Sequence, residues 1–353
     1  MEERAVHPIC SFKEFEKHLG SYISSVKTVL RPTEDIHVKD AVTSKTLCIL
    51  RKEVLPMEMG QTTVDHYLPI LKKMESSNRG FAAGNKERVQ KEKYERSNSV
   101  HSTIAGFIDS PNNKYPCRLT QFSKKHFDAY QKGIPMIREI DKVFQKTLPH
   151  QYQAQRNYAD QTKYRIEDTA FTTVTMNYNF QTAVHLDKGD CKEGFGILVV
   201  WSNKVEGGHL LFPRYDLGIV VNPGDILFMD VHEYHCNSKI ELLAPDSYRM
   251  SLVCYLRTRL LDCRHNALLE ELGMEEGKHW DTEIFVSRIL ETISQPPPIK
   301  QAFPENPKNW SAETDRYRMT CKNRQYKLHD KWLKKQVLSL HHIWEYLKVT
   351  ANL

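Results

Sequence analysis

The sequence predicts an α+β fold in which a double-stranded β-helix (jelly-roll) core is flanked by N-terminal and C-terminal helices. Between residues 169 and 256 apolar and polar residues alternate with a period of two, in six short runs rich in β-branched and aromatic residues. Short connections containing Gly, Pro and Asp join these runs, with no helical segment between them, which is typical of an antiparallel sandwich or jelly roll. On both sides of this region apolar residues recur every three or four positions, as in amphipathic helices.

The same change of pattern divides the chain into three parts. Residues 1–165 are expected to form a helical and mixed segment that packs on the core, residues 166–260 the β-helix core itself, and residues 261–353 a helical extension. A chain of 353 residues could hold two average domains, but decorated barrels and sandwiches reach this length as one unit. We therefore expect one compact domain.

Local signals place the elements of the N-terminal part. Ser11 is a plausible N-cap for a helix over "SFKEFEKHLGSYISSVK", and "LCILRKEVLP" reads as a short buried strand closed by Pro56. The charged stretch from residue 76 to residue 99 predicts a mobile loop or a solvated helix, with a nucleic-acid contact as the less favoured alternative. "STIAGFID" predicts a strand, and residues 123–152 predict helices packed on a sheet, with Pro135 dividing or opening one of them.

Composition narrows the setting and the partners. The net charge of +6 suits a polyanionic partner such as DNA without establishing one. The eight cysteines are scattered without a C-x-x-C pair, and the first residues carry no apolar signal core, which favours a reducing compartment, nuclear or otherwise intracellular. No apolar run approaches the ~20 residues that cross a bilayer, so no membrane partner is expected. A monomer is favoured, although the sequence leaves the oligomeric state open.

The motif "VHLDKGD" places His185 and Asp187 two residues apart, just after the run "FTTVTMNYNF". A jelly roll should return another ligand from a later strand, and "GDILFMDVHEYHCNS" offers His232 and His235. Two histidines and one carboxylate leave adjacent coordination positions open, which is the arrangement of non-haem Fe(II) oxygenases. Zinc would more often use a tetrahedral Cys/His set, whose spacing is missing here.

The organic acid that usually completes such an iron site is 2-oxoglutarate, whose far carboxylate needs a cationic clamp. "YRMSLVCYLR" supplies Arg249 and Arg257, and a planar guanidinium suits a carboxylate better than an ammonium does. Arg249 is preferred because it lies closer to the histidine motif and inside the strand, while Arg257 remains the competitor.

Three longer segments resemble a known family. "FTTVTMNYNFQTAVHLDKGD", "GGHLLFPRYDLGIVVNPGDILFMDVHEYHCN" and "YRMSLVCYLR" are similar to the oxygenase domain of the TET/JBP family, and in particular to its JBP branch, the thymine hydroxylases of base J synthesis. The resemblance covers roughly residues 45 to 260. It implies iron ligands at His185, Asp187 and His235, because the family's distal ligand is the histidine followed by "CN", and leaves His232 as a neighbour.

The resemblance also implies the roles around the iron. The 2-oxoglutarate arginine falls on Arg249. Asn177 and Asn179, in the strand that leads into the motif, are expected to reach the cosubstrate or the target base, with a hydrogen bond inside the sheet as the alternative. Basic and aromatic residues near the mouth are expected to contact phosphates and bases, with these candidates: Lys124, Lys125, Lys188, Arg214 and Tyr215.

The implied activity is that of an Fe(II)- and 2-oxoglutarate-dependent dioxygenase. It would use O2, with ascorbate as a candidate reductant, to hydroxylate the C5 methyl group of thymine or 5-methylcytosine in DNA, on a base flipped out of the duplex. A 2-oxoglutarate oxygenase that acts on RNA, a free nucleobase or a protein is one alternative. A catalytically inactive DNA-binding relative is the other.

Overall fold

The structure, a computed structural model, describes residues 1–84, 99–109, 117–162 and 164–261. By contacts the chain divides into two units, Met1–Cys263 and Arg264–Leu353, and the description below concerns the first. The helices expected after residue 261 lie outside the described residues, as does most of the charged stretch between residues 76 and 99. In the part of the chain that is described, no helix is long and apolar enough to cross a membrane.

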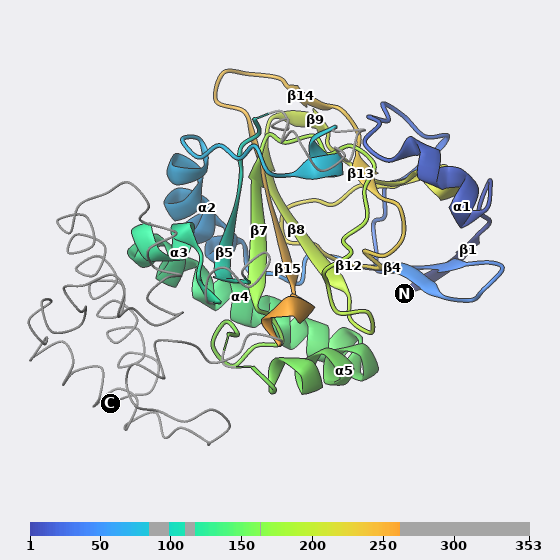
Figure 1. Cartoon of the computed structure of the whole chain (residues 1–353). Coiled ribbons are helices and arrows are strands. Elements are labelled where there is room, and N and C mark those ends of the chain that lie inside the picture. The colour runs from blue at the N-terminus through green and yellow to red at the C-terminus, as the bar shows by residue number, and fades with distance from the viewer. Residues whose placement is uncertain (85–98, 110–116, 163, 262–353) are drawn as a thin grey trace, which may run out of the picture. The chain divides into compact units, whose positions relative to one another are not determined.

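A nine-stranded mixed sheet forms the centre of the unit (Figure 1). Its neighbours pair antiparallel, except for the parallel pair at one edge formed by the first two strands of the order that follows. In spatial order the strands are β1 (Glu2–Val6), β3 (Ile36–Asp40), β4 (Thr46–Arg51), β12 (Ile226–Met229), β8 (Gly196–Asn203), β15 (Tyr248–Tyr255), β7 (Thr173–Tyr178), β5 (Ser102–Ile108) and β6 (Arg118–Leu119).

Two smaller sheets complete the strands. One has four strands, in the order β13 (Cys236–Asn237), β10 (Leu210–Phe212), β11 (Leu217–Ile219) and β2 (Thr28–Leu30). The other pairs β14 (Ile240–Leu242) with β9 (Val205–Gly207).

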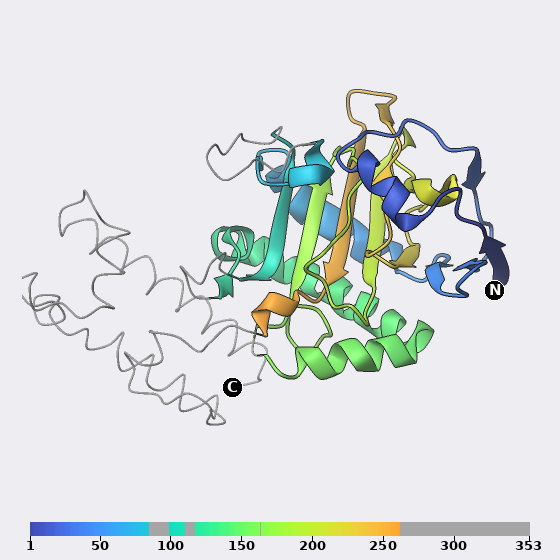
Figure 2. The ribbon, with the colours of Figure 1, turned by 45° about the vertical axis from the view of Figure 1, so that its right-hand side comes forward.

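Most of the helices gather on one side of the large sheet, as the turned view shows, whereas the short helix at Phe15 packs with Leu211 and Cys236 of the four-stranded sheet (Figure 2). The described helices are α1 (Phe12–Phe15), α2 (Met57–Leu71), α3 (Gln121–Lys125), α4 (Phe127–Thr147) and α5 (Pro149–Ala159). Short 3-10 turns are η1 (Glu16–His18), η2 (Gly80–Ala83), η4 (Pro213–Tyr215) and η5 (Thr258–Leu260).

The alternation along β15 shows how the two faces of the large sheet are used. Met250, Leu252 and Cys254 join the core that the sheet forms with α2, α4 and α5. Because successive side chains of a strand point to opposite faces, Arg249 and Ser251 point the other way. On that second face, apolar residues of β4, β8 and β12 pack against β10 and β11 of the four-stranded sheet. Polar residues of β15 therefore line the space on the side of the second sheet.

The mixed α+β class is confirmed, and all six predicted strand runs are strands: β7, β8, β10, β11, β12 and β15. The strands expected in "LCILRKEVLP" and "STIAGFID" are also present, as β4 and β5. Residues before position 110 do more than cover the core, since β1, β3, β4 and β5 belong to the large sheet itself.

Some local predictions were wrong. Pro135 neither divides nor opens a helix, because α4 runs without a break from Phe127 to Thr147. An interior proline costs a helix ~3 kcal/mol, and here Ile134, Met136 and Ile137 bury a face of α4 in the core that offsets this cost. Ser11 does form a capping box with Glu14, but α1 ends after one turn.

Candidate active site

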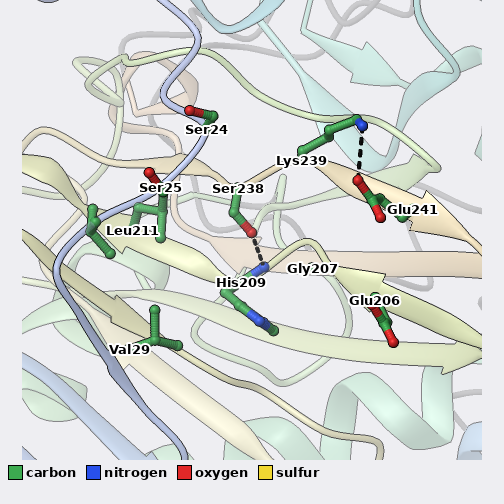
Figure 3. Close-up of a pocket in the computed structure, with 11 residues that line it drawn as sticks. Ser24, Ser25, Val29, Glu206, Gly207, His209, Leu211, Ser238, Lys239 and Glu241 are labelled. Atoms are coloured by element: carbon green, nitrogen blue, oxygen red, sulfur yellow. Dashed lines mark hydrogen bonds and ion pairs between the residues drawn. The ribbon is translucent and has the colours of Figure 1, made fainter.

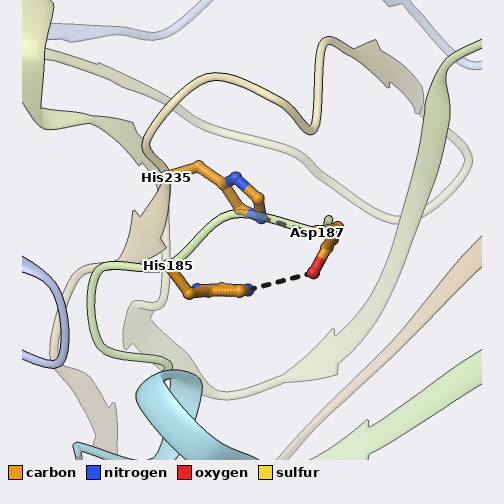
Figure 4. Close-up of side chains that lie close together, drawn as sticks. All are labelled: His185, Asp187 and His235. Atoms are coloured by element: carbon orange, nitrogen blue, oxygen red, sulfur yellow. Dashed lines mark ion pairs between the residues drawn. The ribbon is translucent and has the colours of Figure 1, made fainter. Parts of the chain in front are cut away.

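Three side chains converge where the chain segment that follows β7 runs beside the residues just before β13 (Figure 4). One ligand atom from each of His185, Asp187 and His235 lies within 4.8 Å of the others. The two Asp187 oxygens divide between the histidines: Oδ1 is 3.8 Å from His185 Nε2, and Oδ2 is 3.6 Å from His235 Nε2. We call these residues the triad. His232 lies outside it and faces Asp230, with Nδ1 3.4 Å from the carboxylate.

The backbone brings the two histidines together. His185 and His235 form an isolated antiparallel bridge, in which each backbone N–H donates to the carbonyl of the other residue, at 3.0 and 3.2 Å. The Asp187 N–H donates to the Val231 carbonyl at 3.0 Å. Segments that are 50 residues apart in sequence are thereby held in register at the point where the side chains meet.

Each imidazole is oriented by a backbone carbonyl two residues before it. His185 Nδ1 lies 2.8 Å from the Ala183 carbonyl, and His235 Nδ1 lies 2.9 Å from the Glu233 carbonyl. A carbonyl only accepts, so each Nδ1 carries a proton, and in the neutral form of the ring Nε2 is the atom that offers a lone pair. This is the arrangement in which histidine binds a metal through Nε2.

The electrostatics act on the two histidines in opposite directions: burial alone would lower the pKa of His235, but the hydrogen bond and the charge of Asp187 raise it. Burial, followed by the neighbouring His235, lowers the pKa of His185 to about 4, so this ring is neutral near pH 7. Burial alone would raise the pKa of Asp187, but the hydrogen bond with His235 and the charges of the histidines lower it to about 2. Two imidazole lone pairs and one carboxylate make a donor set that fits Fe(II) and leaves further coordination positions open.

Arg249 is the second element of the site. It is 5% exposed, and no side chain or carbonyl among the described residues accepts a hydrogen bond from its guanidinium. Burial lowers the pKa of Arg249 to about 10, and no neighbouring anion counteracts this. An arginine remains charged at neutral pH, so a buried guanidinium without an acceptor fits an anionic ligand.

Arg257, the competing clamp, is already engaged. Its Nε forms an ion pair with the carboxylate of Asp109, and its backbone N–H donates to Thr172 Oγ1 at 2.8 Å. Of the two candidate arginines, Arg249 is therefore the one with a guanidinium available to a ligand.

Gly208 lies between Arg249 and β13, the strand that begins just after His235. A Cβ at this position would lie 2.6 Å from Arg249 Nε, and its φ of +64° also disfavours other residues. The Gly208 carbonyl accepts from Asn237 Nδ2 at 3.3 Å, and Asn237 lies two residues after His235. Asn237, the asparagine of the "CN" pair after His235, is therefore bonded to Gly208, the residue against which Arg249 packs.

The two predicted asparagines both have partners inside the sheet. Asn179 has a φ of +47°, and its Oδ1 accepts from the Arg249 backbone N–H at 2.7 Å. Its own N–H donates to the Arg249 carbonyl at 2.9 Å. Asn177 accepts from Ser102 Oγ and donates to Ser251 Oγ. Asn179 thus fixes the backbone of the clamp residue, while Asn177 follows the alternative of a hydrogen bond within the sheet.

The prediction that Arg214 and Tyr215 contact nucleic acid was wrong. Arg214 is 8% exposed and Tyr215 6%, and both are bonded to buried carboxylates. Neither side chain can reach a phosphate or stack on a base in this state. Lys188 is exposed directly beside Asp187, and Lys125 is exposed at the end of α3.

A pocket of about 410 Å³ lies apart from the triad (Figure 3). It is bounded by the segment before β2, the link between β9 and β10, and the link between β13 and β14, and His209 lines it. The His209 N–H donates to Ser238 Oγ at 3.0 Å, and Lys239 pairs with Glu241 at 2.8 Å. None of its described lining residues belongs to the triad, so the candidate chemistry does not lie there.

Several residues of the site were not predicted from the sequence. Glu233 holds His235 through its carbonyl, Gly208 makes room for Arg249, and the Ala82 carbonyl accepts from the Ala183 N–H at 2.8 Å. Repeated glycines in "EGGHLL" were an available signal for a close approach of the backbone. The roles of Glu233 and Ala82 are carried by backbone carbonyls, which no side-chain pattern reveals.

A family model matches the part of the chain that carries these residues. Residues 103–258 match the Tet_JBP family model, described as the oxygenase domain of the 2OGFeDO superfamily. The match includes the triad and Arg249. Among solved structures, NgTET1 in complex with 5mC DNA aligns with a TM-score of 0.46 and 15% identity, over 70% of this chain and 91% of that chain.

Curated relatives match a similar region. The chain is 33% identical over 193 residues to the bifunctional helicase and thymine dioxygenase JBP2 of Leishmania major, an alignment that covers 54% of this chain and 17% of the relative. It is 34% identical over 163 residues to the thymine dioxygenase JBP1-A of Trypanosoma cruzi, covering 45% and 20%. The chain therefore spans a fifth or less of the length of these relatives.

Proposed function

We propose that the protein is an Fe(II)- and 2-oxoglutarate-dependent dioxygenase that hydroxylates the C5 methyl group of a pyrimidine in DNA, and that residues 103–258, which match the Tet_JBP family model, are its oxygenase domain. The observation that carries the proposal is the pairing of two features. The triad offers two imidazoles and a carboxylate, and Arg249 offers a buried guanidinium without an acceptor among the described residues. We assign the two facing sheets to a double-stranded β-helix.

His185, Asp187 and His235 would hold the iron. The Ala183 and Glu233 carbonyls accept from both Nδ1 atoms, which directs each ring to bind the metal through Nε2. Bound there, iron would supply the oxidising chemistry in which one atom of O2 converts a methyl C–H into C–OH and the other goes to 2-oxoglutarate as it becomes succinate and CO2.

Arg249 would bind the far carboxylate of 2-oxoglutarate. A guanidinium can donate two parallel N–H bonds to a carboxylate, which fixes the acid in one orientation. Asn179 supports this by holding both the N–H and the carbonyl of Arg249, so the arginine starts from a fixed backbone. Gly208 leaves the space that the Arg249 side chain occupies.

The substrate would be a base extruded from the duplex, because a stacked methyl group cannot reach a buried metal. Thymine is the first candidate, since the curated relatives that match are named thymine dioxygenases. The alternative is 5-methylcytosine, which carries the same methyl group. Lys188, exposed beside Asp187, is a candidate phosphate contact. Action on DNA would place the protein in the nucleus or another compartment that holds DNA.

The test is a direct assay of the bases. The protein is loaded with Fe(II) and 2-oxoglutarate without oxygen, then exposed to air with oligonucleotides that contain thymine alone or also 5-methylcytosine. The DNA is digested and the nucleosides are weighed, with His185→Ala as the matched variant. We expect a gain of one oxygen on one of the two bases, and none with His185→Ala.

Two other outcomes reject parts of the proposal. Succinate formation without altered DNA would reject a DNA base as substrate and leave an oxygenase that acts on RNA, a free nucleobase or a protein. DNA binding without succinate, altered bases or bound iron would indicate an inactive relative and would reject the dioxygenase.

A further inference from the structure

Two motifs far apart in sequence, "FPRY" and "DVHEYHCN", meet in a buried polar cluster on the side of the four-stranded sheet. Arg214 donates two hydrogen bonds to the Glu233 carboxylate, from Nε to Oε1 at 2.9 Å and from Nη2 to Oε2. Arg214 Nη2 also donates to the Tyr215 hydroxyl, which in turn donates to Asp40 Oδ2 at 2.7 Å. We call Asp40, Arg214, Tyr215 and Glu233 the buried cluster.

All four residues of the buried cluster are less than 9% exposed. Removing charges from water is costly, and buried ion pairs are on average no more stabilising than apolar residues of the same volume. Stability alone therefore does not account for placing two carboxylates and a guanidinium here. Glu233, a member of the buried cluster, lies two residues before His235, which suggests that the cluster positions this histidine.

Glu233 joins the cluster to the triad. Its backbone carbonyl accepts from His235 Nδ1 at 2.9 Å, and its carboxylate Oε1 also accepts from the Tyr234 backbone N–H at 3.0 Å. Residues 231–234 form a turn that belongs to no strand. Backbone bonds hold the turn at Val231, whose carbonyl accepts from Asp187, and at the Glu233 N–H, which donates to the Asp230 carbonyl at 3.2 Å. The two bonds from Arg214 add the constraint that acts on the Glu233 side chain.

The N-terminal segment closes the cluster from outside. Arg214 Nη1 donates to the Cys10 carbonyl at 3.3 Å, and the Arg214 carbonyl accepts from the Ile9 N–H at 2.8 Å. Tyr234 packs against Phe12 and Phe15, with ring centroids 4.5 and 5.3 Å apart. The turn that precedes His235 is therefore held by its side chains on both sides.

We propose that Arg214 is a positioning residue for the metal site: through Glu233 it orients the His235 ring so that Nε2 faces Asp187. This inference rests on the proposed function, because it takes His235 as a metal ligand. Arg214 touches neither the triad nor a substrate, so it acts only through the turn. Partners that orient metal-binding histidines typically change metal affinity ~10- to 100-fold when they are removed.

The test measures metal affinity in the full-length protein. Mn(II) is titrated into the wild type, Arg214→Met and Tyr215→Phe, and free Mn(II) is counted by electron paramagnetic resonance well below the melting temperature of each variant. Lys52→Met is the matched control, because it breaks another buried ion pair, Lys52 with Asp225 at 2.7 Å, which has no hydrogen bond to the triad. The visible spectrum of the Co(II)-loaded proteins reports ligand geometry in parallel.

We expect Arg214→Met to weaken Mn(II) binding ~10- to 100-fold and to alter the Co(II) spectrum. Tyr215→Phe removes one hydroxyl from the buried cluster and should weaken Mn(II) binding roughly two- to fivefold. This variant tests the inference even if Arg214→Met does not fold. Lys52→Met should bind as the wild type does. Wild-type Mn(II) affinity and Co(II) spectrum in the folded cluster variants would overturn the inference. A wild type that binds no metal would instead refute the proposed function.

Discussion

Arg214 and Arg249 are two buried arginines of the same unit, and they differ in the hydrogen-bond partners of their guanidinium groups. Arg214 has a bidentate carboxylate partner in Glu233, a hydroxyl from Tyr215 and a carbonyl from Cys10. Arg249 has no acceptor among the described residues, although it is at least as well buried. The hydrogen bond to Glu233 raises the pKa of Arg214, whereas burial lowers that of Arg249.

The contrast separates a charge that the fold has satisfied from one that it has left for a ligand. A buried charge without a partner is unfavourable, and a bound anion relieves that cost. The satisfied arginine should therefore affect stability and metal geometry. The unsatisfied one should affect ligand affinity and leave stability unharmed.

The largest expected effect is on stability at the satisfied arginine. Arg214→Met leaves the Glu233 carboxylate buried without its cation, which should cost ~3–5 kcal/mol of unfolding free energy. Urea denaturation of the metal-free protein measures this. A loss below ~1 kcal/mol, the level of a surface ion pair, would contradict the description of Arg214 as satisfied and buried.

The next effect is on 2-oxoglutarate at the unsatisfied arginine. Arg249→Met should weaken 2-oxoglutarate binding by ~2–5 kcal/mol, because a buried carboxylate would lose its charged partner. The same substitution should leave the unfolding free energy unchanged or higher, because it removes an unpaired buried charge. Anaerobic calorimetry with Mn(II) gives the affinity, and urea denaturation gives the stability. Destabilisation as large as that of Arg214→Met would abolish the contrast between the two arginines.

Ligand binding should in turn stabilise the fold. At 100 times its dissociation constant, 2-oxoglutarate should add ~2.7 kcal/mol to the unfolding free energy of the metal-loaded wild type. Thermal unfolding with and without the acid checks this. At that same concentration the unfolding free energy of Arg249→Met should barely increase. Lys52→Met, which breaks the ion pair with Asp225, should show the full increase of the wild type.

The smallest effect is expected at the residue that holds the clamp. Asn179→Ala removes the acceptor for the Arg249 N–H and strains a position whose φ is +47°, which should cost ~1–2 kcal/mol. The 2-oxoglutarate dissociation constant should rise several-fold. Asn179→Asp keeps an acceptor and tolerates the left-handed conformation, so it should restore most of the affinity. Equal losses in both variants would show that Asn179 does not act through this hydrogen bond.

The sequence was most informative where one local pattern determines one local structure. Alternating apolar residues identified β7, β8, β12 and β15, since each strand buries at least one face in a core. The spacing of His185 and Asp187, with a later histidine, named the three side chains that the fold brings together. Whether these residues bind iron remains a prediction.

The sequence was least informative where partners lie far apart. Arg214 looked like a surface cation because its carboxylate partner lies 19 residues away, and Asp40, which completes the cluster, is 175 residues from Tyr215. The helix α2 was not predicted, because Gly60 and Pro69 weaken its pattern, although Gly60 packs directly on Trp201. These features depend on tertiary contacts, which no local window contains.

The most direct test of the account is a titration of 2-oxoglutarate into the Fe(II)-loaded protein without oxygen, followed by visible absorption. If the triad and Arg249 form one site, a charge-transfer band should appear only when both iron and the acid are present. It should be missing in Asp187→Ala and should require far more acid in Arg249→Met. No band in the wild type, or a band unchanged by both substitutions, would contradict the assignment of these residues to one iron and 2-oxoglutarate site.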